Sequence, residues 1–220
     1  MTRTEDYEHR AQPIDEHERR VQATTPPPAK SSKPITRMPV HFPKHIRPNR
    51  KLDERLWARF PGLMHFSAAL ITRLPENWRL RRLMVVYWVK RSYEIVNRRD
   101  FELALAAQDP AIVISWAQNP SGRVPGDLVG DFHGYEGFRQ VWDAWLEPFD
   151  DLRLEPEEVV DLGGVRLLVT MRAIGHGSGS GIEAAERGYT LFTFRRGKVL
   201  RQELFFDRAQ AEQAAGLVAR

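Results

Sequence analysis

The sequence has no cysteine among its 220 residues. This absence excludes disulfide bonds, thiolate nucleophiles and cysteine-ligated metal sites. No run of eighteen apolar residues occurs either, so we expect no membrane-spanning helix. The first residues, MTRTED, lack the apolar region of a secretory signal. Together these absences predict a cytoplasmic protein without a metal or another cofactor.

Acidic residues are scarce in the first part of the chain. Residues 1–100 carry 21 basic and 11 acidic side chains, whereas residues 101–220 carry 12 and 18. A basic segment of this kind suits an acidic partner or an anionic membrane surface, or it is simply solvated. We favour the solvated segment, because no nucleic-acid-binding motif accompanies the charge. We therefore expect no nucleic-acid partner, and contact of this segment with a membrane surface stays open as the less favoured alternative.

Residues that can build a core are few before position 50. Residues 1–50 are polar, charged and rich in proline, which predicts a disordered basic tail. Helical spacing of apolar residues begins in residues 51–76, which we interpret as a helical extension broken at Pro61 and Pro75. The main domain is predicted over residues 77–217.

The main domain changes from helical to β-strand patterns near Asp109. Helices are predicted over 77–97, 101–108 and 135–149, the second capped by Asp100, and a short terminal helix is capped by Asp207. The helix over 135–149 carries an apolar stripe that we expect to be buried: Phe138, Val141, Trp142, Trp145, Leu146 and Phe149. Residues 111–116 form a short strand, and residues 117–134 a long loop rich in glycine and proline. Two hairpins follow, turning at Gly163-Gly164 and near Gly197. This order gives an α+β fold in which a curved antiparallel sheet wraps around helices as a cone.

The element order resembles the nuclear transport factor 2-like superfamily, in its SnoaL-like and ketosteroid-isomerase-like branch. The resemblance rests on YEIVNRRDFELALAAQDPAIVIS, FHGYEGFRQVWDAWLEPF, VVDLGGVRLLVTMRAIGHGSGSGIE and TFRRGKVLRQELFFDRAQAEQAAGL. It implies a cone-shaped half-barrel with an apolar pocket for a small hydrophobic molecule, and a homodimer.

The resemblance also implies where catalytic groups would lie. Ketosteroid isomerases use an Asp base near the end of the first short strand, and an Asp and a Tyr that donate hydrogen bonds to an oxyanion. The base position falls at Ser115 or Trp116, neither of which can accept a proton from a carbon acid. The oxyanion positions fall near Tyr189 and Ser92. The ketosteroid isomerase base is therefore missing.

Other residues could still serve acid/base chemistry on a polyketide- or steroid-like substrate. Asp131 and His133 could act as an acid/base pair, with Tyr189 as a hydrogen-bond donor. For ligand binding we select six further residues: Ser115, Trp116, Trp142, Arg172, His176 and Glu203. The alternatives are that His133 only enters a helix, that the tryptophans fill the core, and that Arg172 and Glu203 form cross-strand ion pairs outside the sheet.

Four glycines and two serines lie within residues 172–184. A phosphate-binding loop needs a following Lys and helix, whereas here a strand follows. We interpret this segment as a connection between two strands, with two alternatives: it lines the mouth of a pocket, or it only lets the chain turn. Three functions stay open: an acid/base enzyme, a non-catalytic binding or sensor protein, and a homodimeric interaction module.

Overall fold

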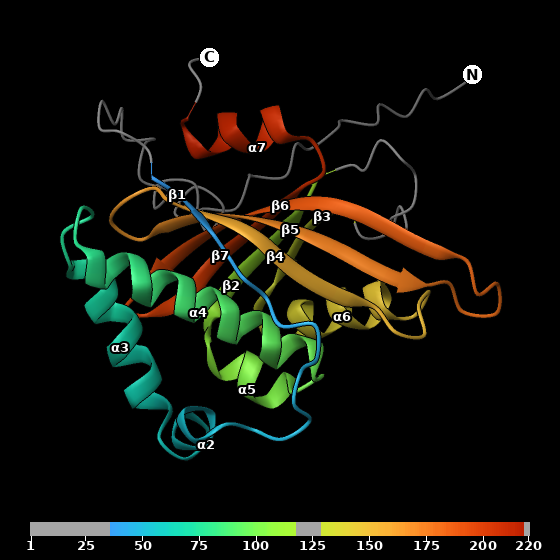
Figure 1. Cartoon of the computed structure of the whole chain (residues 1–220), viewed down its shortest axis with the longest axis horizontal. Coiled ribbons are helices and arrows are strands. Elements are labelled where there is room, and N and C mark those ends of the chain that lie inside the picture. The colour runs from blue at the N-terminus through green and yellow to red at the C-terminus, as the bar shows by residue number, and fades with distance from the viewer. Residues whose placement is uncertain (1–35, 118–128, 218–220) are drawn as a thin grey trace, which may run out of the picture. The chain divides into compact units, whose positions relative to one another are not determined.

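The computed structural model describes residues 36–117 and 129–217, all within one compact unit spanning residues 33–220 (Figure 1). Within these residues the elements, in chain order, are β1 (Arg37–Pro39), α2 (Leu52–Arg59), α3 (Pro61–Arg73), α4 (Arg79–Asn97), α5 (Phe101–Ala106), β2 (Gln108–Trp116), β3 (Gly130–His133), α6 (Gly134–Leu146), β4 (Arg153–Asp161), β5 (Arg166–His176), β6 (Glu183–Arg195), β7 (Lys198–Phe205) and α7 (Arg208–Ala215).

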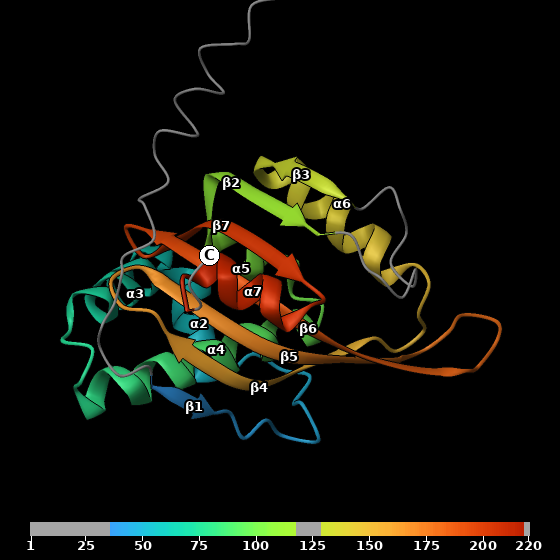
Figure 2. The same cartoon turned by 90° about the horizontal axis from the view of Figure 1, so that it is seen from above.

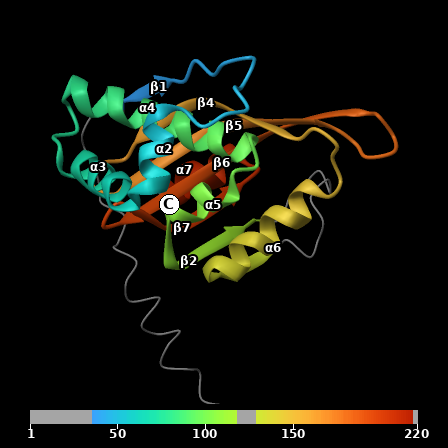
Figure 3. The ribbon, with the colours of Figure 1, turned by 90° about the horizontal axis from the view of Figure 1, so that it is seen from below.

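The strands form one curved, open sheet in the order β1-β4-β5-β6-β7-β2-β3 (Figures 2 and 3). The α+β class and the wrapping of helices by the sheet are confirmed. The prediction of an antiparallel sheet is wrong at one place, because β2 and β7 pair in parallel. The chain leaves β2 through β3 and α6, builds the β4–β7 meander, and returns along the free edge of β2 in the same direction.

The two faces of the sheet are covered by different helices. The inner face packs against α4, α5 and α6 in the main core, where Phe138, Val141, Trp142 and Trp145 form the predicted apolar stripe of α6. The outer face carries α7, whose Ala211 and Ala215 cover one apolar cluster. Residues that alternate along a strand therefore enter two separate environments.

The predicted turns and caps are confirmed. Gly163 and Gly164 join β4 to β5 with positive φ, and Gly197 turns β6 into β7. The Asp100 carboxylate accepts a hydrogen bond from the Leu103 amide, and Asp207 accepts one from the Gln210 amide at 2.8 Å. The glycine-rich segment connects β5 to β6, as expected.

Two predicted irregular segments contain strands. Residues 37–39 fall in the expected disordered tail, yet β1 pairs antiparallel with β4 and buries Met38. The backbone groups of β1 form hydrogen bonds with the edge strand β4, and this distant pairing is not visible in the local sequence. β3 likewise lies in the expected long loop and pairs with β2. Residues 1–35 and 118–128 of these two segments lie outside the described residues.

The helices expected as an extension share the core of the main domain. The Trp57 ring of α2 stacks on Trp88 of α4 with centroids 4.9 Å apart, and Met64 of α3 is buried. Across the part of the chain with described structure, no helix combines the length and hydropathy required to cross a bilayer.

Candidate functional site

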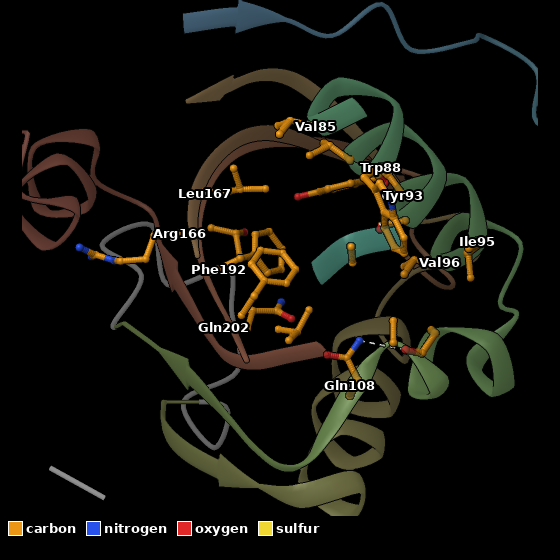
Figure 4. A pocket seen from close by; sticks show the side chains of 18 of the residues that line it. Val85, Trp88, Tyr93, Ile95, Val96, Gln108, Arg166, Leu167, Phe192 and Gln202 are labelled. Atoms are coloured by element: carbon orange, nitrogen blue, oxygen red, sulfur yellow. Dashed lines mark hydrogen bonds between the residues drawn. The ribbon is translucent and has the colours of Figure 1, made fainter. Parts of the chain in front are cut away.

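A cavity of about 140 Å³ lies between α3, α4, α5, α6 and the inner face of the sheet (Figure 4). Aliphatic and aromatic side chains make up most of its lining, among them Val85, Trp88, Val89, Phe138, Trp142 and Phe192. Such a lining favours an apolar occupant, and the few polar groups within it decide how that occupant is oriented.

Tyr93 brings the first polar group into the cavity. It lies on the inward stripe of α4, eight residues after Val85 and four after Val89, and all three side chains are buried. Its hydroxyl is in hydrogen-bond contact with the buried Thr190 of β6. Burial raises the pKa of Tyr93 above its usual value of 10. The phenol therefore stays neutral at physiological pH and can donate a hydrogen bond.

Gln108 brings the second polar group, at the start of β2. Its Nε2 donates to the Ala104 carbonyl oxygen at 2.9 Å, and this bond fixes the amide orientation because a carbonyl oxygen can only accept. The buried Oε1 on the other side of the amide has no hydrogen-bond partner among the described residues (Figure 4). A buried acceptor without a partner is costly, so a donor from a bound molecule would stabilise it.

Phe192 and Gln202 extend from the sheet on the same side of the cavity (Figure 4). They are register partners on β6 and β7, so their side chains stand next to each other on the inner face. Thr190 lies two residues before Phe192 and faces the same way. These three residues supply one aromatic ring, one amide and one hydroxyl to the lining.

Helix α3 covers one end of the cavity. Ala68, Ile71 and Thr72 of this helix belong to the lining. The β6–β7 turn touches α3 so closely that a Cβ atom on Gly197 would lie 1.9 Å from the His65 carbonyl oxygen. Only glycine fits at that position, which also has a positive φ of 78°.

Arg81 holds the end of α3 in place. Its guanidinium forms two hydrogen bonds with Asp161 of β4, at 2.6 and 2.8 Å. It also donates to the carbonyl oxygens of Ile71, Thr72 and Leu74, which lie at the C-terminal end of α3. Both side chains of the pair are almost fully buried, with exposed fractions of 3% and 5%. Arg81 is therefore part of the scaffold of the cavity.

The lining contains no Asp, Glu or His side chain among the residues that the structure describes. Its two charged residues are Arg81, which is paired with Asp161, and Arg166. The Arg166 guanidinium points away from the cavity and donates to the Ala214 carbonyl oxygen (Figure 4). Burial lowers the pKa of Arg166. The cavity thus offers hydrogen bonds, but it offers no carboxylate or imidazole to abstract a proton.

Three of the sequence-predicted residues come together on the outer face. Ser115 is the register partner of both Asp131 on β3 and Glu203 on β7, so the three form one row across the sheet. Arg201 donates to the Ser115 hydroxyl at 3.1 Å and pairs with Glu203 at 3.3 Å. This row faces away from the cavity, since Glu203 also stands opposite Leu191, which packs in the cluster under α7.

The other polar candidates also lie outside the cavity. His133 is exposed at the end of β3, and Tyr189 packs in the outer cluster that α7 covers. Arg172 forms the cross-strand ion pair with Glu155 at 3.0 Å that we gave as its alternative role. His176 ends β5, where its Nδ1 lies 2.8 Å from the Asp151 carboxylate in an exposed pair.

The two predicted tryptophans are buried in the main core. Trp142 lines the cavity, and it is the one residue of the nine candidates that does. Trp116 packs edge-on against Trp145 with centroids 4.9 Å apart, and its indole nitrogen has no described partner.

Sequence reasoning missed Tyr93, Gln108, Thr190 and Gln202. The resemblance pointed to Ser92 and Tyr189, each one residue before a buried polar side chain of the lining. Ser92 also belongs to the lining, but it is exposed and its hydroxyl bonds back to the Trp88 carbonyl oxygen. The sequence did contain a signal for Thr190, because the alternation along residues 189–193 places its side chain on the same face of the strand as Phe192.

No group of three His, Asp or Glu side chains able to hold a metal ion occurs within residues 36–117 and 129–217. The glycine-rich turn lines a separate hollow through Gly177, Ser180 and Ile182, next to Phe149 and Phe206. It therefore takes no part in the cavity around Tyr93.

Solved structures with a related fold are found. An NTF2-like protein of unknown function from Burkholderia pseudomallei is 26% identical, with 57% of this chain and 92% of that chain covered and a TM-score of 0.47. TerC, co-crystallised with polyporic acid, is 24% identical over 58% and 93% of the two chains, with a TM-score of 0.46. RV0760c from Mycobacterium tuberculosis, in complex with estradiol-17beta-hemisuccinate, is 16% identical over 54% and 89%, with a TM-score of 0.44.

The curated proteins contain no significant match to this chain. The family model of the SnoaL-like domain matches residues 89–202, which is more than half of the chain. The matched segment begins inside α4, before Tyr93, and ends at Gln202 on β7, so it contains Tyr93, Gln108, Thr190 and Gln202. The chain belongs to the SnoaL-like domain family, within the nuclear transport factor 2-like superfamily.

Proposed function

We propose that this protein binds one small, mainly apolar molecule with a hydroxyl group inside the cavity, as a binding or sensor protein and not as an acid/base catalyst. The observation that carries the proposal is the composition of the lining. Tyr93, Thr190 and Gln108 supply hydrogen-bonding groups to an otherwise apolar space, and the described lining has no carboxylate or imidazole.

The volume of the cavity supports a ligand of about one ring. Pockets for drug-sized molecules usually measure about 300 to 1,000 Å³, whereas an apolar cavity of about 150 Å³ holds benzene. At about 140 Å³ this cavity matches the smaller class. A steroid or an extended polyketide would need the helices to move apart, so a one-ring molecule is favoured.

The polar groups support a ligand that both accepts and donates a hydrogen bond. The Tyr93 hydroxyl is a donor for an oxygen of the ligand, and Gln108 Oε1 is an acceptor that lacks a partner in the described chain. A phenolic or alcoholic hydroxyl has both properties. A ligand without a donor would leave Oε1 unsatisfied, which costs about 1 to 3 kcal/mol.

The homodimer and the cytoplasmic location stay predictions in this proposal. Light scattering after size exclusion would measure the first, and cell fractionation the second. Acid/base catalysis by Asp131 and His133 would require a substrate on the outer face, away from the cavity around Tyr93.

The test compares three one-ring probes of similar size: phenol, anisole and toluene. Phenol donates and accepts a hydrogen bond, anisole only accepts, and toluene does neither. Binding is measured by calorimetry with the wild-type chain and with Ala68→Leu, which adds side-chain volume to the lining of the cavity. The matched control is Ala58→Leu, at an exposed position of α2.

The proposal predicts that phenol binds best and toluene least. The affinity should fall about fivefold from one probe to the next, because each probe in the series forms one hydrogen bond fewer. Ala68→Leu should abolish binding of all three probes without lowering the melting temperature, since it fills empty space. Equal binding by Ala68→Leu and wild type would refute a ligand site in this cavity.

A further inference from the structure

Six large apolar side chains are exposed along one outer face of α2, α3 and the junction between them. Their exposed fractions run from 43% for Leu70 to 78% for Leu52, and the set is Leu52, Leu56, Phe60, Leu63, Phe66 and Leu70. We refer to these six residues as the apolar ridge. Scattered exposed leucines are ordinary, but a row of this kind usually marks a surface for interaction.

The ridge follows the geometry of the two helices. Leu52 and Leu56 are four residues apart on α2, and Leu63, Phe66 and Leu70 follow the i, i+3, i+7 spacing on α3. The opposite side of α3 holds Met64, Ala68 and Ile71, which are buried in the unit. Helix α3 is therefore apolar on two sides, and folding of the described unit uses only one of them.

The exposed charges beside the ridge are positive. Arg55, Arg59 and Arg73 are exposed on these helices. The two acidic residues of the same segment are already paired: Asp53 with Arg91 at 2.8 Å, and the buried Glu54 with Arg98 at 2.8 Å. A face of leucine, phenylalanine and arginine without a free carboxylate has the composition of a helix that lies on an anionic bilayer.

A second copy of the chain fits this face poorly. A symmetric dimer would bring the same patch of both copies together. Arg55, Arg59 and Arg73 would then approach their own counterparts, with no unpaired acid on the face to compensate for the repulsion. The residues before position 36 contain no Leu, Phe or Trp, so their sequence offers little to cover an apolar ridge.

We infer that the outer face of α2 and α3 docks on an anionic membrane surface. The leucine and phenylalanine side chains enter the boundary between headgroups and acyl chains, and the three arginines contact lipid phosphates. Because the other side of α3 lines the cavity, docking places the cover of the cavity against the bilayer. This inference does not depend on the identity or existence of a cavity ligand.

The test measures binding of the full chain to sedimented vesicles of phosphatidylcholine, with and without about 30 mol% phosphatidylserine. Two variants probe the ridge: Leu63→Ser with Phe66→Ser, and Arg55→Glu with Arg59→Glu. Their matched controls are Ile182→Ser, which is 71% exposed on the β5–β6 turn, and Arg139→Glu on α6, with a side chain 55% exposed. Circular dichroism and light scattering report folding and oligomeric state.

The wild type should bind the anionic vesicles at least tenfold more strongly than the neutral ones, and binding should weaken as salt is added. The serine variant should lose at least tenfold, the glutamate variant about fivefold or more for each arginine removed, and both controls should bind as the wild type does. Three results would each overturn the inference: no binding by the wild type, unchanged binding by both ridge variants, or a dimer that the serine variant converts to a monomer.

Discussion

The contact between Tyr93 and Thr190 is the most informative feature at the scale of single residues. The tyrosine comes from a helix and the threonine from a strand, and each is buried at the same end of the apolar cavity. Burial raises the pKa of the phenol, so its proton stays available for donation to a ligand oxygen. A neutral donor in an apolar space recognises an oxygen without moving a proton.

Tyr93→Phe removes this donor and keeps the ring. We expect phenol to bind about fivefold more weakly, because one hydrogen bond is lost, whereas toluene binding should be unchanged. Tyr189→Phe is the matched control, since that hydroxyl belongs to the outer face of the sheet. Calorimetry with both probes measures the difference, and an equal loss for phenol and toluene would point to altered packing in place of a lost hydrogen bond.

His176 and Asp151 form an exposed pair at the end of β5 whose titration can be predicted. The hydrogen bond that the His176 ring donates to the Asp151 carboxylate raises the pKa of His176, and bonds from the His176 backbone and ring lower the pKa of Asp151. The histidine contribution to stability is present below its ordinary pKa of about 6.5 and is lost as the pH rises through the raised value. The aspartate contribution is present above its ordinary pKa of about 3.9 and is lost as the pH falls through the lowered value.

An NMR titration of His176 measures this effect directly. The pKa should lie above 6.5 in the wild type. Asp151→Asn should return it toward the ordinary value, because the hydrogen bond to the carboxylate is the largest cause of the raised pKa. Asp150→Asn removes a neighbouring charge with a smaller influence and should move the pKa less. Equal shifts in the two variants would contradict a specific Asp151 contact.

At the scale of elements, helix α3 connects the cavity to the β6–β7 turn and to a buried ion pair. One side lines the cavity, the turn between β6 and β7 touches it at Gly197, and its last carbonyl oxygens are bound by Arg81. The ion pair between Arg81 and Asp161 links α4 to β4 across the end of this helix. The buried ion pair therefore keeps helix α3 in place over one end of the cavity.

Arg81→Met should destabilise the chain by about 3 to 5 kcal/mol, because it leaves the buried Asp161 carboxylate and three carbonyl oxygens without their donor. Arg187→Met is the control, since its pair with Glu157 is exposed and should contribute about 1 kcal/mol or less. Urea unfolding gives both free energies. Hydrogen exchange should also become faster in α3 of the Arg81 variant, and equal losses of stability in the two variants would exclude the structural role of Arg81.

At the scale of the whole molecule, the segment before α2 adds an edge strand to the sheet and apolar side chains to the core. β1 extends the sheet beside β4, Met38 and Val40 are buried, and Arg50 forms two hydrogen bonds with Asp100 at 2.6 Å. Without this segment, the outer strand β4 would become an exposed edge.

A chain that begins at residue 51 should therefore be less stable than a chain that begins at residue 36. Loss of two buried apolar side chains alone predicts a difference of about 3 kcal/mol or more. Thermal and urea unfolding of the two truncated chains give this difference. An equal midpoint would show that β1 adds nothing to the folded state.

The sequence predicted the elements with strong local signals. The α6 stripe, the caps at Asp100 and Asp207 and the glycine turns depend on neighbouring residues and were confirmed. β1 and β3 were missed because only their partner strands make them strands. The parallel pairing of β2 with β7 was missed because residues about 90 positions apart decide it.

The site was predicted less well than the fold. The chosen residues were the ionisable ones, such as Asp131, His133 and Glu203, and ionisable side chains of a sheet usually face water. The cavity selects neutral groups in place of charges, because burial disfavours the charged form. A shift of one residue from Tyr189 to Thr190 moves a side chain from the outer face to the cavity. The alternation groups Thr190 with Phe192, but it does not say which of the two faces lines the cavity.

The central claim is that the cavity beside Tyr93 holds a one-ring ligand, and a crystal structure of the full chain grown with phenol tests it most directly. We predict electron density for one ring between Phe192 and Trp142, with its oxygen within hydrogen-bond distance of the Tyr93 hydroxyl and Gln108 Oε1. A cavity that stays empty at a saturating phenol concentration, or phenol bound only on the outer face of the sheet, would contradict the account.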